Sequence, residues 1–367
     1  MSASRPWHPL RRSLGVLATI GLALGCSSHA RAADSWQAAP YSLGQGLYFP
    51  QQGLRIGGYA NLQYYSLKAE KSTLQSRDAS LFVSRDIGSR WQLFGEVDAS
   101  DAVKLSGGHS GGEDSGIDIE RLYVDYHAGQ AISFRFGKFL TPVGQWNLIH
   151  ADPLTWTVSR PLATSAAFAR HAAGAMMFGT LSLHGRDLDY WVFADDSKNL
   201  GIGHDQDHAF SSYGANDSIR NNFRQATGAR VLYHMVNDRL SVGMSWLIYT
   251  LQEPQQKYQL TGLDFSWSTR YATLSGEAIY RSGRHADAPV EHGGFLEAEV
   301  PLPGRLYVVG RYERYRTSLA TQTTTLRTLG INYRPIQGIV LKVEHREGSH
   351  NARLAPSGWL ASIAVLF

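Results

Sequence analysis

The sequence is poor in cysteine and in long apolar stretches. Its 367 residues include one cysteine, Cys26, so no disulfide can form within the chain. Beyond the first thirty residues, no apolar run approaches the ~20 residues that a membrane-spanning helix needs. These two scarcities exclude a disulfide-stapled scaffold and a helical membrane domain. Aromatic residues and glycine are plentiful, which fits a soluble all-β protein or an outer-membrane barrel, whose strands give only a weak hydropathy signal.

The net charge is also small when the N-terminal residues are left out. The whole chain has a formal charge of +4. The N-terminus has the three parts of a secretory signal peptide. Arginines precede an apolar run over 14–25, and Ala30 and Ala32 provide small residues at the cleavage site, so a signal peptide is predicted over 1–32. Its removal takes away four arginines and no acidic residue, so the mature chain is close to neutral and no nucleic-acid partner is expected. Lipoprotein cleavage before Cys26 is the alternative.

Alternation of apolar and polar residues runs through the rest of the chain. Leu122 and Val124, for example, point away from the face that carries Arg121, which is the period-two pattern of a strand. Sixteen segments show this pattern, and the predicted strands are 54–67, 76–87, 91–103, 117–128, 131–143, 168–183, 186–196, 222–236, 238–252, 256–268, 270–283, 292–302, 305–317, 323–336, 339–349 and 358–367.

The connections between these segments alternate between very short and longer ones. Transmembrane barrels have this arrangement, with tight periplasmic turns and longer outer loops. An even number of strands also lets the last strand pair with the first. We therefore predict an all-β fold, a transmembrane antiparallel β-barrel of about 16 strands over 54–367, preceded by an irregular periplasmic leader over 33–53. The last strand ends at Phe367 and resembles the C-terminal strand that the barrel assembly machinery reads.

One face of the strands carries most of the charges. A Lys or Arg facing lipid at the midplane costs about 2–4 kcal/mol, so these side chains are expected to face water. A barrel of about sixteen strands encloses an aqueous channel, which places the charged face in the lumen. The residues predicted to line the pore or its constriction are Glu96, Asp98, Arg121, Asp125, Arg135, Lys138, His150, Asp152, Arg160, Arg170, Arg281, Arg311, Lys342 and Arg346. Other charges predicted on this face are Arg230, Asp264, Glu277, Glu297, Glu299, Glu313 and Glu344.

A long segment, 144–166, interrupts the strand pattern and is the predicted throat of the channel. The run before it, Arg135-Phe136-Gly137-Lys138-Phe139-Leu140-Thr141-Pro142-Val143-Gly144, resembles the R-x-G-K-x-x-x-P-x-G run of the phosphate-selective porin family of the O/P type. The resemblance implies a homotrimeric porin whose loop folds into the barrel and whose lumen cations attract anions. Because the predicted lining carries both signs of charge, it is expected to concentrate anions less than a purely basic lining would.

Three short motifs carry candidate chemistry, and each has a simpler interpretation. The run 108–112, Gly-His-Ser-Gly-Gly, matches a nucleophile-elbow pattern that needs a helix after it, but a glycine-rich loop continues there instead. The run 204–208, His-Asp-Gln-Asp-His, has metal-ligand residue types, but nothing in the sequence closes the coordination sphere. His150 and Asp152 could relay a proton, or could hold the loop by hydrogen bonds. No catalytic residue, metal site or cofactor is predicted.

Taken together, these patterns predict a porin and not an enzyme. The expected function is passive diffusion of small hydrophilic solutes across the outer membrane of a Gram-negative bacterium, with a preference for small anions such as phosphate. Expected partners are outer-membrane lipid and lipopolysaccharide, the barrel assembly machinery and further copies of the chain. The alternative is a barrel that scaffolds an outer-membrane enzyme or a secretion or electron-transfer complex.

Overall fold

The computed structural model describes only part of the chain. The described residues are 41–68, 70–106, 109–111, 116–149, 151–200, 222–252, 255–284, 290–317, 323–350 and 354–367. The barrel is built from the unit Ser42–Phe367. The predicted signal peptide, 1–32, lies outside the described residues.

Sixteen long antiparallel strands form in the described residues, which confirms the predicted fold class. They are β3 (Leu54–Leu67), β4 (Thr73–Ile87), β5 (Trp91–Ser106), β7 (Gly116–His127), β8 (Ser133–Leu140), β9 (His171–Leu183), β10 (Arg186–Asp195), β11 (Phe223–Met235), β12 (Leu240–Leu251), β13 (Lys257–Ser268), β14 (Thr273–Gly283), β15 (Val290–Leu302), β16 (Leu306–Arg316), β17 (Thr324–Ile336), β18 (Ile339–Ser349) and β19 (Gly358–Leu366).

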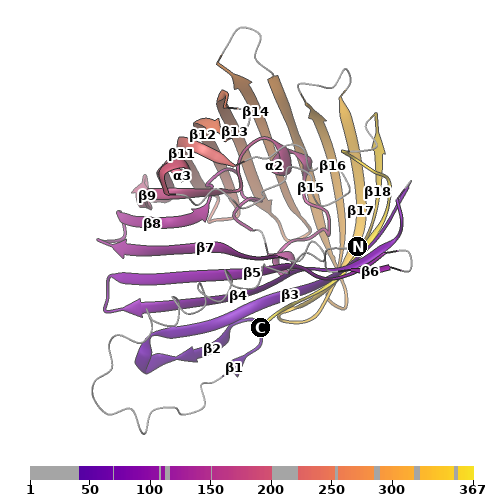
Figure 1. Cartoon of the computed structure of the whole chain (residues 1–367), viewed down its shortest axis with the longest axis horizontal. Helices are drawn as coiled ribbons and strands as arrows, with labels where there is room; N and C mark the ends of the chain where they lie inside the picture. Colours follow the sequence, from indigo (N-terminus) through magenta and orange to yellow (C-terminus); the bar gives the residue numbers. More distant parts are fainter. Residues whose placement is uncertain are drawn as a thin grey trace, which may run out of the picture. The chain divides into compact units, whose positions relative to one another are not determined.

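The strands follow one another around the wall in sequence order, from indigo to yellow in Figure 1. The last strand pairs with the first: in β19, Ala364 lies opposite Asn61 of β3, and the register runs from Gly358↔Leu67 to Leu366↔Tyr59. This pairing closes the barrel and removes both sheet edges.

Short elements accompany the long strands. They are β1 (Tyr41–Ser42), β2 (Gly46–Phe49), β6 (His109–Gly111), the 3-10 helices η1 (Pro50–Gln52) and η2 (Asp152–Leu154), and the helices α2 (Leu162–Ala166) and α3 (Ser197–Leu200). The leader expected to be irregular thus contains β2, which pairs with β3 through Leu47↔Ile56; four residues are too few for the period-two pattern to stand out. No helix in the described part of the chain is long and apolar enough to span a membrane.

Connection length sorts the two ends of the barrel, as the sequence suggested. The turn between β9 and β10 is two residues long, His184 and Gly185, both with positive φ (54° and 72°). Positive φ at both central residues matches the twist of the flanking strands, as in type I′ turns. We call the end with these tight turns the short-turn end. At the other end, 141–170 separates β8 from β9.

The outer face of the barrel is apolar and the inner face is polar. In β17, Thr328 and Asn332 are buried, whereas Leu329 and Ile331 are 64% and 56% exposed. The outer face also carries large aromatic side chains toward both ends, as the interfacial girdles of membrane barrels do. Those near the short-turn end are Trp91, Trp267, Tyr271 and Tyr333, and those toward the other end are Tyr64, Tyr280 and Trp359.

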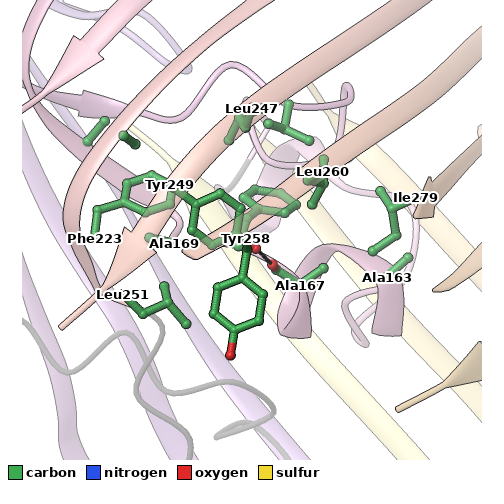
Figure 2. Packing of buried hydrophobic residues seen from close by; sticks show 14 of the residues in the cluster. Ala163, Ala167, Ala169, Phe223, Leu247, Tyr249, Leu251, Tyr258, Leu260 and Ile279 are labelled. Carbon is green, nitrogen blue, oxygen red and sulfur yellow. Dashed lines mark hydrogen bonds between the residues drawn. The ribbon is translucent and has the colours of Figure 1, made fainter. Parts of the chain in front are cut away.

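A buried apolar cluster joins the barrel wall to the segment 141–170. Figure 2 shows Ala163, Ala167 and Ala169 of this segment beside Tyr249 and Leu260 of the wall. Alanines let the backbone approach closely, and the Tyr249 hydroxyl donates a hydrogen bond to the Ala167 carbonyl. The long segment therefore packs inside the barrel, as expected.

Candidate pore and its inner loop

The segment 141–170, here called the inner loop, leaves and rejoins the wall at adjacent points. The Thr141 amide donates to the Arg170 carbonyl at 2.8 Å, and Leu140 pairs with His171 in the β8–β9 ladder. The Asn147 amide side chain donates to the carbonyls of both Thr141 and Arg170, at 2.8 and 3.0 Å. The strand predicted over 131–143 ends at Leu140 in the structure. Pro142 has no N–H group to donate to the hydrogen-bond ladder of a neighbouring strand, so the strand does not continue through it.

Carboxylates on the wall accept hydrogen bonds from the backbone of the inner loop. Glu277 accepts from the amides of Gln145 and Trp146, each at 2.7 Å. In the same way, Glu344 accepts from 158 and 159 at 2.8 and 3.0 Å, and Glu313 accepts from 162 at 2.7 Å. These charge-assisted bonds satisfy loop amides that would otherwise be buried without a partner.

Lys342 holds the middle of the inner loop. Its ammonium donates to a carboxylate oxygen and the carbonyl of Asp152, both at 2.6 Å, to the Thr155 hydroxyl at 2.7 Å and to the Thr157 carbonyl at 3.1 Å. Lys342 is only 2% exposed and Asp152 5%. This is a buried ion pair whose remaining hydrogen-bonding groups are also satisfied, the condition under which such a pair is tolerated.

Arg311 anchors the next part of the inner loop. It donates to the Thr157 hydroxyl at 2.6 Å and to the Ser159 carbonyl at 2.9 Å. It also forms ion pairs with Glu297 at 3.1 Å and Glu313 at 2.8 Å. Arg311 and Lys342 therefore face the interior of the barrel beneath the inner loop.

Other residues predicted to line the pore are also buried. Arg281 pairs with Glu291 at 2.7 Å and donates to the Ala167 carbonyl at 3.3 Å. Arg346 donates to the Pro356 carbonyl at 2.8 Å, and Lys138 to the Ile119 carbonyl at 2.6 Å. The alternation placed Arg281 and Arg346 on the lumen face, but it could not show that the loop or the strand backbone covers them. The prediction that Lys138 lines the pore is wrong, because Lys138 lies two residues after the outward-facing Phe136 in a regular strand ladder.

A second set of charges lies on the wall formed by β5, β7 and β8 and at the end of the inner loop. Arg121 pairs with Glu96 at 2.5 Å, and Arg135 binds both carboxylate oxygens of Asp125 at 2.8 Å. Arg170 lies 3.1 Å from Glu120. We call the three arginines, 121, 135 and 170, the arginine face.

The arginine face is more exposed than the acids that it pairs with. The arginine side chains are 23%, 23% and 32% exposed, whereas the paired carboxylate side chains of Glu96, Asp125 and Glu120 are 0%, 2% and 11% exposed. Two of the guanidinium groups pack against aromatic rings. The guanidinium carbon of Arg135 lies 3.7 Å from the centre of the Tyr123 ring, and that of Arg121 lies 4.7 Å from the centre of the Phe94 ring. Positive charge is therefore nearer to the lumen than negative charge.

Glu120 belongs to this arrangement, although sequence reasoning missed it. Glu96 pairs with Arg121 in the β5–β7 ladder, but the next residue, Val97, pairs with Ile119. Glu120 is the extra residue of a β-bulge. A bulge breaks strict alternation, so two successive side chains can serve the same face.

The remaining predicted pore residues lie in different places. Asp98 accepts a hydrogen bond from the Ser80 hydroxyl at 2.7 Å on the wall beside the arginine face. Arg160 donates to Asn147 within the inner loop at 2.7 Å. His150 lies outside the described residues, so its pairing with Asp152 stays a prediction.

The candidate chemical motifs fall partly outside the described residues as well. Residues 109–111 of the glycine-rich run form β6, which pairs with β5, and 204–208 are not described. Within the described residues, no group of three or more His, Cys, Asp or Glu side chains is placed to hold a metal ion.

No family model matches the chain. An uncharacterized protein of Aquifex aeolicus is 22% identical, over 88% of this chain and 81% of that protein.

Three solved structures share the architecture. Salmonella typhi OmpF in complex with daunomycin has a TM-score of 0.60 and 10% identity, over 88% of this chain and 99% of that one. The anion-selective porin from Comamonas acidovorans has a TM-score of 0.56 and 15% identity, over 85% and 98%. The trimer form of OmpT from Vibrio cholerae has a TM-score of 0.57 and 10% identity, over 86% and 99%. The chain therefore has the barrel fold of bacterial outer-membrane porins.

Proposed function

We propose that this chain is a passive diffusion channel of the bacterial outer membrane that prefers small anions, inorganic phosphate among them. The barrel has an apolar outer face and a charged inner face, and a long loop narrows its interior. The observation that carries the anion preference is the arginine face, in which the arginine side chains are partly exposed while the acids that neutralise them are more deeply buried.

Distance makes this arrangement selective despite its small net charge. Coulomb energy falls with separation, and water screens the more distant carboxylate more strongly than the nearer guanidinium. An anion that passes the arginine face therefore meets attraction first, and low-dielectric walls focus that field. Of the two basic residues in the motif that resembles the phosphate-selective porins, Arg135 belongs to this face, whereas Lys138 binds the backbone carbonyl of Ile119.

Planar-bilayer recording in a potassium chloride gradient tests the proposal. The purified protein is expected to give discrete conductance steps and a reversal potential that favours chloride. A reversal potential that favours potassium would overturn the anion preference. Absence of conductance from correctly folded protein would overturn the channel itself.

The proposal includes the route and assembly of the chain. Residues 1–32 are proposed to direct export and to be cleaved, residues 33–53 to lie on the periplasmic side, and the strand ending at Phe367 to be read by the barrel assembly machinery. A homotrimer surrounded by outer-membrane lipid and lipopolysaccharide is proposed, and the likeness to OmpT of Vibrio cholerae, which has been solved in a trimer form, supports it. N-terminal sequencing of the membrane form and its mobility in native gels test these points.

A further inference from the structure

A cavity of about 150 Å³ lies between the inner loop and the wall strands β13 to β15. Three carboxylates line it, from Glu277, Glu297 and Glu299, and no lysine, arginine or histidine is among its lining residues in the described part of the chain. It is next to the turn between β13 and β14, because Ser266 and Thr273 line it as well. The cavity therefore lies toward the short-turn end, which porins place in the periplasm.

The three carboxylates differ in how fully they are satisfied. Glu277 accepts two amide hydrogen bonds from the inner loop, and Glu297 pairs with Arg311. Glu299 is 3% exposed and shares a side-chain hydrogen bond with Glu297, so these two adjacent acids hold a proton between them. The Oε2 atom of Glu299 receives no hydrogen bond from a donor among the described residues. A buried carboxylate oxygen without a donor is costly, so a cationic donor that enters the cavity would relieve that cost.

The other side of the cavity is apolar and aromatic. Ile149 and Leu154 of the inner loop line it and are 41% and 52% exposed, which is high for aliphatic side chains inside a barrel. The aromatic lining residues are Trp146, Trp156, Phe265 and Phe295. A hydrated inorganic cation gains little from such surfaces, whereas an ammonium ion with an apolar body gains from both the rings and the aliphatic groups.

We propose that this cavity is a binding site for small organic ammonium ions. The ammonium group donates to Glu299, and its apolar body packs against Ile149 and Leu154. The site is distinct from the arginine face, which acts on anions. A solute that carries both charges therefore meets a favourable group of each sign within the barrel.

Calorimetric titration of the folded mature chain in detergent tests the site without relying on conduction. Benzylammonium chloride is the probe, and benzyl alcohol and potassium chloride are its neutral and inorganic counterparts. Benzylammonium is expected to bind, and Glu299→Gln is expected to weaken its binding by roughly tenfold or more, since a charge-assisted hydrogen bond is lost. Asp189→Asn is the matched control, because Asp189 is a lumen-side acid that is absent from the cavity lining and bonds Thr180 and His234 instead.

A second variant keeps the test decisive if Glu299→Gln fails to fold. Leu154→Ser alters an exposed side chain and is expected to weaken benzylammonium binding more than methylammonium binding. Unchanged benzylammonium affinity in both variants, or in the one that folds, would overturn the proposal. Equal binding of benzyl alcohol would reduce the site to an apolar cavity, and displacement by potassium at equal concentration would make it an inorganic cation site; either result overturns the proposal. A folded chain that binds benzylammonium but gives no conductance would contradict the proposed channel and leave this site intact.

Discussion

The two sides of the barrel use the same kinds of charged residue in different ways. On the side of the arginine face, Arg121 and Arg135 pair with acids of a neighbouring strand and keep about a quarter of their side-chain surface exposed. On the side of β14 to β18, Arg311 and Lys342 are buried because they bind the inner loop. Inward orientation therefore does not make a charge part of the pore; the inner loop decides which charges a solute can meet.

The charged residues on the side of β14 to β18 mainly stabilise the inner loop. Carboxylates there accept hydrogen bonds from loop amides and cations donate to loop carbonyls, so these side chains hold the inner loop in place. The arginines of the arginine face pair with acids of the wall instead, and their side chains keep part of their surface exposed toward the interior of the barrel. Five experiments test this division between a buried and an exposed set of charges.

Removal of the inner loop should erase the difference between the two sides. Replacement of 144–166 by a short glycine-rich linker is geometrically feasible, because Thr141 and Arg170 are already hydrogen-bonded. The barrel is expected to form, its single-channel conductance to rise several-fold and its ion selectivity to fall, since the buried charges of β14 to β18 become exposed. Unchanged conductance would show that the loop does not narrow the path.

Loss of one anchor should destabilise the inner loop strongly. Lys342→Met leaves the Asp152 carboxylate buried without its partner and is expected to cost about 3–5 kcal/mol in the free energy of unfolding. Urea unfolding, followed by tryptophan fluorescence, measures the change. Addition of Asp152→Asn should recover part of the loss, and wild-type stability of the single variant would contradict the structural task assigned to Lys342.

Substitutions in the arginine face should change ion selectivity. At a separation of about 6 Å in water, one charge contributes ~0.7 kcal/mol, so Arg135→Gln is expected to lower the anion-to-cation permeability ratio about threefold. Arg314→Gln is the matched control, because Arg314 is an exposed arginine two residues from Tyr312 on the outward-facing side of β16. Equal shifts in the two variants would contradict a special role for the arginine face.

Paired neutralisation shows whether exposure or net charge sets that selectivity. Arg121→Gln alone leaves Glu96 uncompensated, whereas Arg121→Gln with Glu96→Gln keeps the net charge of wild type. If exposure is decisive, the double variant still loses anion preference, measured as a reversal potential in a salt gradient. A double variant that matches wild type would favour net charge instead.

A change in salt concentration should alter the anion preference less than any of the substitutions does. The Debye length shortens from about 10 Å at 0.1 M to about 3 Å at 1 M, so exposed charges are screened while buried pairs are not. The anion preference is expected to decline across this range, and the unfolding free energy is expected to change little. A preference that is constant with salt would indicate a buried or steric origin.

The sequence was sufficient for the barrel but not for the way its lumen is filled. Period-two alternation follows directly from strand geometry, and β3 and β18 begin and end at the predicted residues. The partner of Lys342, by contrast, is 190 positions away, at Asp152. Local patterns carry no information on such a contact. Glu120 was missed for a different reason, because a bulge interrupts the alternation on which the prediction depended.

Thiol reactivity at two adjacent positions tests whether water lies inside the barrel and lipid outside. Arg135 belongs to the arginine face, whereas Phe136 is 49% exposed on the outer face, and residues 33–367 contain no cysteine. Arg135→Cys and Phe136→Cys are incorporated into bilayers and treated with a charged, membrane-impermeant methanethiosulfonate. The current is expected to change in steps for Arg135→Cys and to stay constant for Phe136→Cys. Reaction at 136 without reaction at 135 would contradict the account.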